Sequence, residues 1–521
     1  MCVANFAQTV REKPASAWRE RRPTMAMKLA DLGKQLLVCR TVGDPRSEVA
    51  GLASDSRRVR PGDLFFCLRG LTRDGHDYAG EAVAKGAAAL VVERELPFAV
   101  PQLIVPDSQR ALALLADAFF GRPTRLLKPI GVTGTNGKTT TTWLIERILL
   151  DAGVPAGVIG TVEIRFAGRS RPASVTTPDV LELQRLFREM ADAGVRRCVM
   201  EVSSHALEQG RVRGVRFRTA VFTNLTQDHL DYHGTMEAYA AAKGLLFSRL
   251  GNAYEDDPAE RSYAVLNADD PASEGFARLT SAEVVTYGIE RGAMVRAVDV
   301  KATSRGASFT AETFAGSRRI HLRLVGRFNV YNALAALSAA LCEGIPLEAA
   351  AASLERVSGV PGRLESVDEG QPFAVVVDYA HTPDGLDNVL RAVRNIAEGR
   401  VICVFGCGGD RDRTKRPVMG RIAATLADFV WVTSDNPRSE DPAAIARDIE
   451  AGIREAGCPA DRYALEVDRR AAIFRAVEMA KPGDVVLIAG KGHETYQIVG
   501  GEMLPFDDRL VASEAIRSRM R

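Results

Sequence analysis

Residues 129 to 143 have the order and residue types of a loop that binds phosphate groups. A short apolar run enters the turn Gly-Thr-Asn-Gly-Lys-Thr-Thr, and the chain leaves it with Trp143, Leu144, Ile145, Ile148 and Leu149 at the spacing of a helix with one buried face. Gly134 and Gly137 let backbone N–H groups approach a phosphate closely. Lys138 places a charge on the terminal phosphates, and the Thr139 hydroxyl can bind Mg²⁺. A tight turn with a chance lysine is the alternative, and this pattern seldom arises without a phosphate.

Length and composition limit the fold and the function that the whole chain can have. A chain of 521 residues is too long for one core, so we expect three domains. With 68 basic and 66 acidic residues the net charge is +2, which does not indicate a nucleic-acid partner. No apolar run has membrane-spanning length and no signal-peptide core is present, so we expect a cytoplasmic protein. The eight cysteines are scattered, which favours free buried thiols.

The N-terminal region divides into an extension and a small domain. Residues 1–26 are polar and basic and predict a disordered extension, with Met25 or Met27 as possible starts. A mitochondrial transit peptide is the rival interpretation, against which the acidic residues of this segment argue. Residues 27–125 alternate strand and helix signals, which predicts a small α/β domain.

The phosphate loop lies in a central region, residues 126–357. Strands are expected near Val154–Ile164, Cys198–Val202 and Ala220–Thr223, separated by helical patterns, which predicts a parallel sheet with helices on both faces. Ligands of such sheets bind beyond the carboxyl ends of the strands. The polar residues that follow each strand are therefore the candidates for chemistry.

Three candidates follow these strands. Glu201 ends one strand and could hold Mg²⁺ or form a strand-end salt bridge. His229 lies among two histidines and two aspartates that could in isolation bind a transition metal, although the glutamate typical of a zinc helix is missing. Lys243, by spacing alone, is a solvated helix lysine.

A third α/β unit, residues 358–521, begins after the central region. Strands are expected at Phe373–Val377, Val401–Phe405, Phe429–Thr433 and Asp484–Ala489. Each strand is followed by a polar motif, in order Asp378-Tyr-Ala-His-Thr-Pro-Asp, Gly406-Cys-Gly-Gly-Asp-Arg-Asp-Arg-Thr-Lys-Arg-Pro, Asp435-Asn-Pro-Arg-Ser-Glu-Asp-Pro and Gly490-Lys-Gly-His-Glu. The predicted fold class is thus α/β with three domains, a central phosphate-loop domain between a small N-terminal domain and a Rossmann-like C-terminal domain.

These motifs together resemble the Mur ligases, from Met27 onward. The phosphate loop is similar to the variant of this family and of the folylpolyglutamate synthases, and Ser54-Asp-Ser-Arg with Pro61-Gly-Asp-Leu-Phe resembles the family's uridine-nucleotide domain. The motif Asp435-Asn-Pro-Arg resembles the members that add a diaminopimelate residue. The resemblance implies an ATP-dependent amide ligase that joins meso-2,6-diaminopimelate to the γ-carboxylate of D-Glu in UDP-N-acetylmuramoyl-L-Ala-D-Glu through an acyl phosphate, in peptidoglycan precursor synthesis.

The resemblance also implies roles for individual residues. ATP is expected to contact Gly134, Thr135, Asn136, Gly137, Lys138, Thr139, Thr140, Asn329 and His381. Helix capping explains Asn329 equally well. The muramoyl dipeptide is expected to contact Ser54, Ser56, Thr176, Thr177, Ser203, Gln209 and Arg211, the last of which could instead be a surface arginine. The expected catalytic group is Lys138, Glu201, His229 and Lys243, and Mg²⁺ would be held by Thr139, Glu201, His229 and Lys243 as its carbamate, N6-carboxylysine.

The amino-acid substrate is the sharpest of these expectations. The contacts implied for diaminopimelate are Arg411, Asp435, Asn436, Pro437, Arg438, Gly490 and Glu494. A bidentate Arg438 contact suits the distal carboxylate that lysine lacks, and Glu494 suits the distal ammonium. The alternative for Asp-Asn-Pro-Arg is an ordinary turn.

Other function classes stay open at this point. They are a Mur ligase for L-lysine, a folylpolyglutamate-synthase-like ligase, and a nucleotide-switched binding protein without ligase activity. A serine hydrolase built on Ser203-Ser204-His205 lacks the Gly-x-Ser-x-Gly elbow. We expect a monomer that binds only small molecules, with no nucleic acid and no membrane span.

Overall fold

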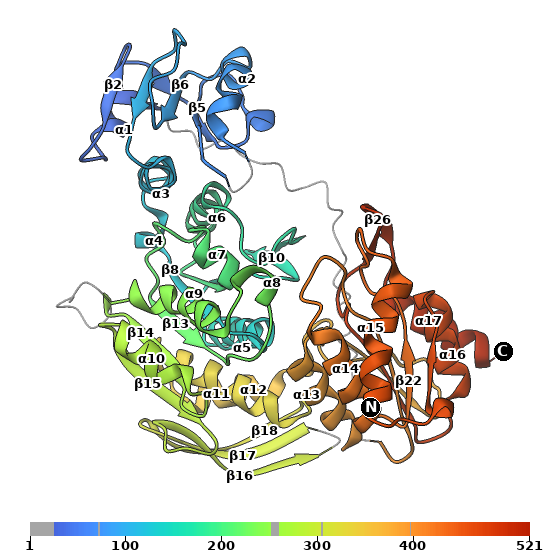
Figure 1. Ribbon diagram of the computed structural model, residues 1–521. Helices are drawn as coiled ribbons and strands as arrows, with labels where there is room; N and C mark the ends of the chain where they lie inside the picture. The colour runs from blue at the N-terminus through green and yellow to red at the C-terminus, as the bar shows by residue number, and fades with distance from the viewer. Residues whose placement is uncertain (1–25, 71–72, 252–259, 304–305, 396, 521) are drawn as a thin grey trace, which may run out of the picture.

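The computed structural model describes residues 26–70, 73–251, 260–303, 306–395 and 397–520. Residues 1–25 of the predicted extension therefore lie outside the described part of the chain. Three α/β units follow one another along the chain, as Figure 1 shows. The predicted three-domain α/β fold is confirmed. The boundaries predicted after residues 125 and 357 lie between the sheets of these units and stay predictions.

The N-terminal unit is a five-stranded sheet in the order β2-β7-β6-β5-β4. Its strands are β2 (Arg40–Val42), β4 (Gly51–Ala53), β5 (Asp63–Phe66), β6 (Ala89–Val92) and β7 (Gln102–Ile104), with a separate short pair β1 (Met27–Lys28) and β3 (Glu48–Val49). Only β2 runs antiparallel to its neighbour within the five strands. Helices α1 (Leu29–Gly33) and α3 (Ser108–Phe119) pack on one face, and α2 (Ala79–Ala84) packs on the other.

The central unit is an eleven-stranded sheet in the order β11-β10-β9-β12-β8-β13-β14-β15-β16-β17-β18. The strands are β8 (Lys128–Thr133), β9 (Ala156–Ile159), β10 (Glu163–Phe166), β11 (Arg169–Pro172), β12 (Arg197–Glu201), β13 (Thr219–Phe222), β14 (Tyr263–Asn267), β15 (Glu283–Gly288), β16 (Val295–Thr303), β17 (Gly306–Thr313) and β18 (Gly316–Leu322). In the order of the sheet, the neighbouring strands β9, β12, β8, β13, β14, β15 and β16 run parallel to one another. Hairpins add antiparallel strands at both edges, β10 and β11 at one edge and β17 and β18 at the other. The predicted parallel sheet is therefore right for the centre and incomplete at its edges.

Helices cover both faces of the central sheet. One face packs against α5 (Lys138–Asp151), α11 (Arg327–Cys342) and α12 (Leu347–Arg356). The other packs against α6 (Val180–Asp192), α7 (Ser204–Glu208), α9 (Met236–Ser248) and α10 (Ala272–Leu279), while α4 (Pro123–Leu126) and α8 (Leu230–His233) are single turns beside them. The phosphate loop thus lies between two helical layers.

Two local predictions in this unit need correction. The single strand expected over Val154–Ile164 is the two antiparallel strands β9 and β10, because the chain turns at Gly160, where a Cβ would lie 2.6 Å from Glu201 Oε1. Trp143 is only half-buried, with the Arg165 guanidinium 4.2 Å from its ring centroid. Helix α5 is buried on most sides, so its threonines, and not the tryptophan, face the core.

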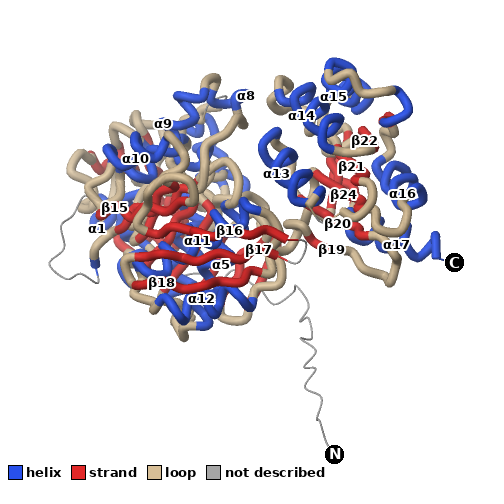
Figure 2. The backbone as a smooth tube through the Cα atoms, turned by 90° about the horizontal axis from the view of Figure 1, so that it is seen from below, coloured by secondary structure: helices blue, strands red, loops and turns tan. Residues whose placement is uncertain are grey.

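The C-terminal unit is a six-stranded sheet in the order β19-β20-β24-β21-β22-β23. Its strands are β19 (Glu365–Ser366), β20 (Ala374–Asp378), β21 (Val401–Phe405), β22 (Phe429–Val432), β23 (Tyr463–Leu465) and β24 (Val485–Ala489), followed by the hairpin β25 (Tyr496–Val499) and β26 (Glu502–Pro505). Helices α13 (Pro383–Arg394), α14 (Lys415–Leu426) and α15 (Pro442–Glu455) cover one face, and α16 (Arg469–Met479) and α17 (Asp508–Met520) cover the other (Figure 2). The four predicted strands are confirmed within one or two residues at each end.

Two further expectations concern the cysteines and the length of the helices. The seven cysteines in the described part of the chain are free thiols, as expected. Among the described helices, none has the length and apolar character needed to cross a bilayer.

Candidate active site

The phosphate loop joins β8, at the middle of the central sheet, to α5. Gly134 and Gly137 have φ of 149° and 84°, backbone conformations that favour glycine. The Lys138 ammonium folds over the loop and donates to the carbonyl oxygens of Gly134 (2.9 Å) and Thr135 (2.8 Å). Lys138 therefore supplies the positive charge expected of a phosphate-binding loop, and the carbonyl oxygens of the loop hold the ammonium in place.

Glu201 ends the adjacent strand and points its carboxylate at the loop. It is 1% exposed and accepts from Thr139 Oγ1 at 3.1 Å, from the Thr161 backbone N–H at 2.8 Å and from Thr161 Oγ1 at 2.9 Å. None of the ion pairs among the described residues includes Glu201, so the salt-bridge alternative is wrong. Thr161 was missed because it follows an unpredicted turn and belongs to no motif.

Lys243 is buried on α9, which makes the solvated-lysine interpretation wrong. It is 1% exposed, its Nζ donates to the Gly134 carbonyl at 2.8 Å, and the same Nζ lies 4.4 Å from the centroid of the Tyr239 ring. Burial and the nearby Lys138 charge place the pKa of this amine well below its ordinary value. The shift favours the neutral amine over the ammonium.

His229 stands beside this lysine with φ of 56°, and its Nε2 is 3.4 Å from Asp228 Oδ2. Burial lowers its pKa to about 3, so the imidazole is neutral and can act as a ligand. No cluster of three His, Cys, Asp or Glu with metal-binding geometry was found in the described part of the chain, which argues against a transition-metal site. The donors that do converge, the Thr139 hydroxyl and the Glu201 carboxylate, are oxygens that fit Mg²⁺.

The expected dipeptide contacts of the central unit come together beside Glu201. Thr177 Oγ1 donates to the Glu201 carbonyl (2.9 Å) and accepts from the Ser203 backbone N–H (3.1 Å). Arg211 donates to the Thr177 carbonyl at 3.0 Å and to Gln209 Oε1 at 2.9 and 2.6 Å. Arg211 is half-buried in this network, so it is not a free surface arginine.

The remaining dipeptide contacts are divided between two units. Thr176 joins the central network, with its Oγ1 3.1 Å from Thr161 Oγ1. Ser54 and Ser56 belong to the N-terminal unit, which lies apart from this network (Figure 1). Ser56 is 7% exposed and donates to Glu81 Oε2 at 2.8 Å. The structure thus does not bring the two serines to the central contacts.

A cavity of about 270 Å³ lies between the central and C-terminal units, next to the phosphate loop. Asn136, Gly137, Thr140 and Asn329 of the predicted ATP contacts line it, with Asn332, Tyr379, Asp384 and Asn388 among its other walls. Asn329 is inside α11, where its Nδ2 donates to the Val325 carbonyl at 2.8 Å and its Oδ1 accepts from Asn332. The capping explanation for Asn329 is therefore wrong, because the helix begins after Gly326 without a side-chain cap.

His381 and its neighbours join the two units beside this cavity. Its Nδ1 is 2.8 Å from the Tyr379 carbonyl, and burial lowers its pKa to about 4. Lys415 Nζ is 3.5 Å from Asp228 Oδ1. Asn136 Nδ2 donates to Asp384 Oδ2 across the interface at 2.8 Å.

Arg363 also contacts the loop from the C-terminal unit. Its Nη2 donates to Thr139 Oγ1 at 3.0 Å, while its guanidinium carbon is 4.8 Å from the Tyr379 ring centroid. The sequence pattern gave no signal for this residue, which stands in an irregular segment before β19. A second cation therefore reaches the phosphate loop from outside its own domain.

The predicted amino-acid contacts form a charged cluster at the strand ends of the C-terminal sheet, buried or partly buried except for Arg411, which is exposed. Asp435, Asn436 and Pro437 are buried, and Arg438 follows with φ of 54° and donates Nη1 to the Gly409 carbonyl at 2.7 Å. Burial and the charge of Arg411 lower the pKa of the Arg438 guanidinium. The well-packed buried positions make an ordinary surface turn the wrong explanation.

The loop after β24 supplies the other residues of this cluster. A Cβ at Gly490 would collide with the Asp435 carboxylate, so only glycine fits there. Asn436 Nδ2 donates to Glu494 Oε2 at 2.9 Å, and Lys491 donates to that same oxygen at 2.9 Å. Burial raises the pKa of Glu494. Lys491, 0% exposed, was not among the predicted contacts although its motif was.

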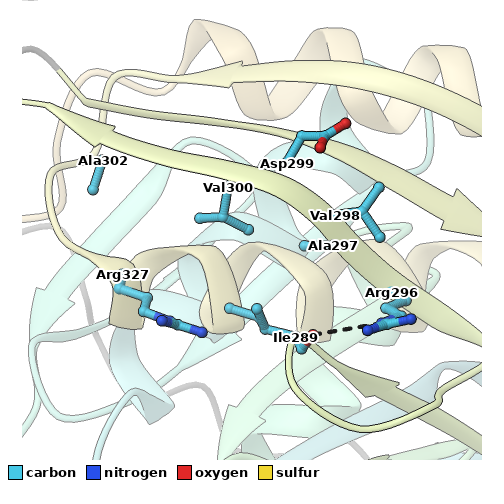
Figure 3. Close-up of a pocket in the computed structure, with 8 residues that line it drawn as sticks. All are labelled: Ile289, Arg296, Ala297, Val298, Asp299, Val300, Ala302 and Arg327. Atoms are coloured by element: carbon cyan, nitrogen blue, oxygen red, sulfur yellow. Dashed lines mark hydrogen bonds between the residues drawn. The ribbon is translucent and has the colours of Figure 1, made fainter.

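A second hollow, of about 440 Å³, lies along β16 (Figure 3). It is lined by Ile289, Arg296, Ala297, Val298, Asp299, Val300, Ala302 and Arg327, and Arg296 Nε donates to the Ile289 carbonyl at 3.5 Å. No predicted site residue lines it. We therefore assign the chemistry to the interface between the central and C-terminal units.

Comparisons with known proteins show the family of the chain. Family models match residues 48–120 (Mur ligase family, catalytic domain), 132–340 (Mur ligase middle domain) and 362–492 (Mur ligase, glutamate ligase domain). The chain is 55% identical over 477 residues to the UDP-N-acetylmuramoyl-L-alanyl-D-glutamate--2,6-diaminopimelate ligase of Geobacillus kaustophilus, covering 92% of this chain and 96% of that one. It is 52% identical over 493 residues to the ligase of the same name from Halalkalibacterium halodurans, covering 95% and 99%.

Solved structures give the same result. A structure of a UDP-N-acetylmuramoyl-L-alanyl-D-glutamate--2,6-diaminopimelate ligase superposes with a TM-score of 0.67 at 34% identity, covering 95% of this chain and 100% of that one. The three matched segments follow the order of the three α/β units. The chain belongs to the Mur ligase family.

Proposed function

We propose that this chain is an ATP-dependent ligase that joins meso-2,6-diaminopimelate to the γ-carboxylate of D-Glu in UDP-N-acetylmuramoyl-L-Ala-D-Glu. The observation that carries the proposal is the charged cluster in which Arg438 and Glu494 interact electrostatically at one end of the C-terminal sheet. A guanidinium and a carboxylate in one cluster suit a ligand end that carries both a carboxylate and an ammonium. The names of the most similar relatives support the same substrate.

In the first step an oxygen of the substrate γ-carboxylate attacks the γ-phosphorus of ATP, and ADP leaves. Negative charge accumulates on the transferred phosphoryl group, so the protein's task is positioning and neutralisation. Lys138 and the loop N–H groups do this from the central unit, and Arg363 does it from the C-terminal unit. Adenine and ribose are placed in the adjoining cavity, where Asn329 lies, with His381 nearby.

A magnesium ion, when bound, supplies further positive charge to the phosphates, and Thr139, Glu201, His229 and carbamylated Lys243 would hold it. The carbamate forms when the neutral Lys243 amine attacks the carbon of CO₂ and releases one proton. The product is an oxygen anion in place of a cation. The low pKa of Lys243 supports this modification because only the unprotonated amine is nucleophilic.

In the second step the free amine of diaminopimelate attacks the acyl phosphate carbon. The tetrahedral adduct expels phosphate, the nitrogen loses a proton, and an amide results. Arg438 and Arg411 bind the distal carboxylate end of the amino acid, and Glu494 and Asp435 bind its distal ammonium. The remaining contacts assigned to substrates are Asn436, Pro437 and Gly490 for diaminopimelate, Thr176, Thr177, Ser203, Gln209 and Arg211 for the dipeptide, and Ser54 and Ser56 for the uridine end.

Phosphate release by the purified protein tests the proposal. The ligase should release phosphate from ATP only when the muramoyl dipeptide and diaminopimelate are both present. Equal release with L-lysine would make the chain a lysine-adding ligase. Release with a folate and glutamate would favour the folylpolyglutamate-synthase alternative, and nucleotide binding without any substrate-dependent release would favour a switched binding protein.

The surroundings of the reaction follow from its substrates. We place the enzyme in the bacterial cytoplasm, where nucleotide-linked precursors and ATP are available, and we expect a monomer. Light scattering of the purified protein would report its mass in solution, and a dimer mass would contradict this expectation.

A further inference from the structure

Lys491 is a fully buried cation with no role in the steps described above. Its side chain is 0% exposed, although lysine is rarely buried unless it is paired. Its Nζ donates to Asn436 Oδ1 at 3.1 Å and to Glu494 Oε2 at 2.9 Å, and it lies 5.6 Å from the Tyr496 ring centroid. Both hydrogen-bond partners are assigned above to the amino-acid substrate.

The hydrogen bonds leave one oxygen of Glu494 available. Oε2 accepts from both Lys491 and Asn436 Nδ2, whereas Oε1 accepts from no residue in the described part of the chain. The Asp435 carboxylate likewise accepts no side-chain or backbone donor among the described residues, while its carbonyl accepts from Gln497. Lys491 therefore fixes the rotamer of Glu494 by one oxygen and leaves the other for a ligand.

The charge of Lys491 also acts on Glu494. Burial and the charge of Asp435 raise the pKa of Glu494, and the charge of Lys491 acts in the opposite direction. Arg438 and Arg469 face the same carboxylate. Without Lys491, Glu494 Oε2 would keep only Asn436 as a donor, and the carboxylate that faces the distal ammonium would be less firmly oriented.

We propose that Lys491 is a positioning residue that sets specificity for the distal ammonium of the amino-acid substrate by holding Glu494 in one orientation. This inference depends on the proposed function. The distal carboxylate is held separately by Arg438, so Lys491 should affect recognition of the ammonium and not of the carboxylate.

The test compares diaminopimelate with 2-aminopimelate, which keeps the distal carboxylate and lacks the distal amine. In Lys491→Met, KM for diaminopimelate should rise about tenfold or more because a charge-assisted contact is lost, with little change in KM for 2-aminopimelate. Equal increases for both substrates would indicate a merely structural lysine and overturn the proposal. If the wild-type protein released no phosphate with diaminopimelate, the proposed function itself would have failed.

A double variant keeps the test decisive if Lys491→Met folds poorly. Lys491→Met/Glu494→Gln removes both buried charges, so no unpaired carboxylate is left. Its loss of preference for diaminopimelate should equal that of Glu494→Gln alone, because Lys491 acts through Glu494. Losses that multiply would show that Lys491 acts independently, which would overturn the proposal.

The pH profile supplies a second readout. The charged and titratable groups that face Glu494 are Lys491, Asp435, Arg438, Arg469, Tyr379 and Tyr496. Removing the Lys491 charge raises the pKa of Glu494 further, so the carboxylate ionises only at higher pH. In Lys491→Met, KM for diaminopimelate should therefore fall more steeply than in the wild type as the pH rises, and KM for 2-aminopimelate, which has the same attacking amine, corrects both profiles for ionisation of that amine. The same corrected profile in the wild type and in a folded variant would contradict the proposal.

Discussion

Replacing Arg438 with glycine should remove most of the preference for diaminopimelate over L-lysine. Glycine is chosen because it adopts the φ of 54° at this position without strain. Arg438 Nη1 is occupied by the Gly409 carbonyl, whereas Nε and Nη2 donate to no residue in the described part of the chain. That free edge of the guanidinium is the one that can grip a carboxylate with two parallel hydrogen bonds.

The magnitude follows from those two hydrogen bonds. Each charge-assisted bond contributes about 1.5–3 kcal/mol, so the pair contributes about 3–6 kcal/mol, or about 10²- to 10⁴-fold in kcat/KM. L-Lysine has no distal carboxylate and should lose little. The ratio of kcat/KM for diaminopimelate to kcat/KM for L-lysine should therefore fall by about this factor. Phosphate release at saturating ATP and dipeptide measures both values.

A nearby arginine provides the matched control. Arg413 lies in the loop after β21, 70% exposed, and pairs with Glu440 at 2.9 Å. Arg413→Gly should leave kcat/KM for both amino acids unchanged. If Arg438→Gly lowered kcat/KM for diaminopimelate and L-lysine equally, the contact with the distal carboxylate would be refuted.

The other predictions concern the phosphate loop and the buried ion pair of Arg469 and Asp508 in the C-terminal unit. Lys243→Ala should abolish phosphate release, and acetate or formate should restore part of it by occupying the space of the carbamate; full activity without rescue would contradict the modification. Arg363→Lys should lower kcat about 10²-fold, because a point charge cannot replace the guanidinium that reaches the loop at 3.0 Å; an unchanged kcat would exclude that role. Asp508→Asn should lower the free energy of unfolding in urea by about 3–5 kcal/mol, because it leaves Arg469 buried and unpaired. The exposed Glu514→Gln should change it by less than about 1 kcal/mol, and equal effects of the two would contradict this account.

Local patterns in the sequence predicted the elements that depend on local interactions. The turn between β8 and α5 was predicted because glycines at positive φ are required there, and β21 was predicted at its observed ends because a continuous apolar run is typical of a buried parallel strand. The antiparallel pair of β9 and β10 was missed because Gly160 turns the chain inside an apolar pattern. Asn329 was ambiguous because capping and ligand binding favour the same residue type at the start of a helix.

Contacts between domains could not be predicted, because nothing in the spacing of residues pairs one segment with another far along the chain. Arg363 and Thr139 are 224 residues apart, and Asn136 and Asp384 are 248 residues apart. Each pair is made only when the C-terminal unit lies against the phosphate loop. The nucleotide cavity itself is a product of that packing, so its far wall had no signature in the sequence.

Two buried lysines show that the neighbours of a side chain determine chemistry that its residue type leaves open. Lys243 and Lys491 are both buried, and sequence alone favoured solvent for the first and gave no role to the second. The ammonium of Lys491 contacts a carboxylate at 2.9 Å, which stabilises its charge. Lys243 contacts a carbonyl and an aromatic ring, and no carboxylate lies within ion-pair distance of it among the residues that the structure describes. Burial without a carboxylate partner therefore favours a neutral amine at Lys243, which can react with CO₂, whereas Lys491 is paired with Glu494 and can orient a substrate contact. The partner of each lysine, and not its exposure, determines which of these functions it can perform.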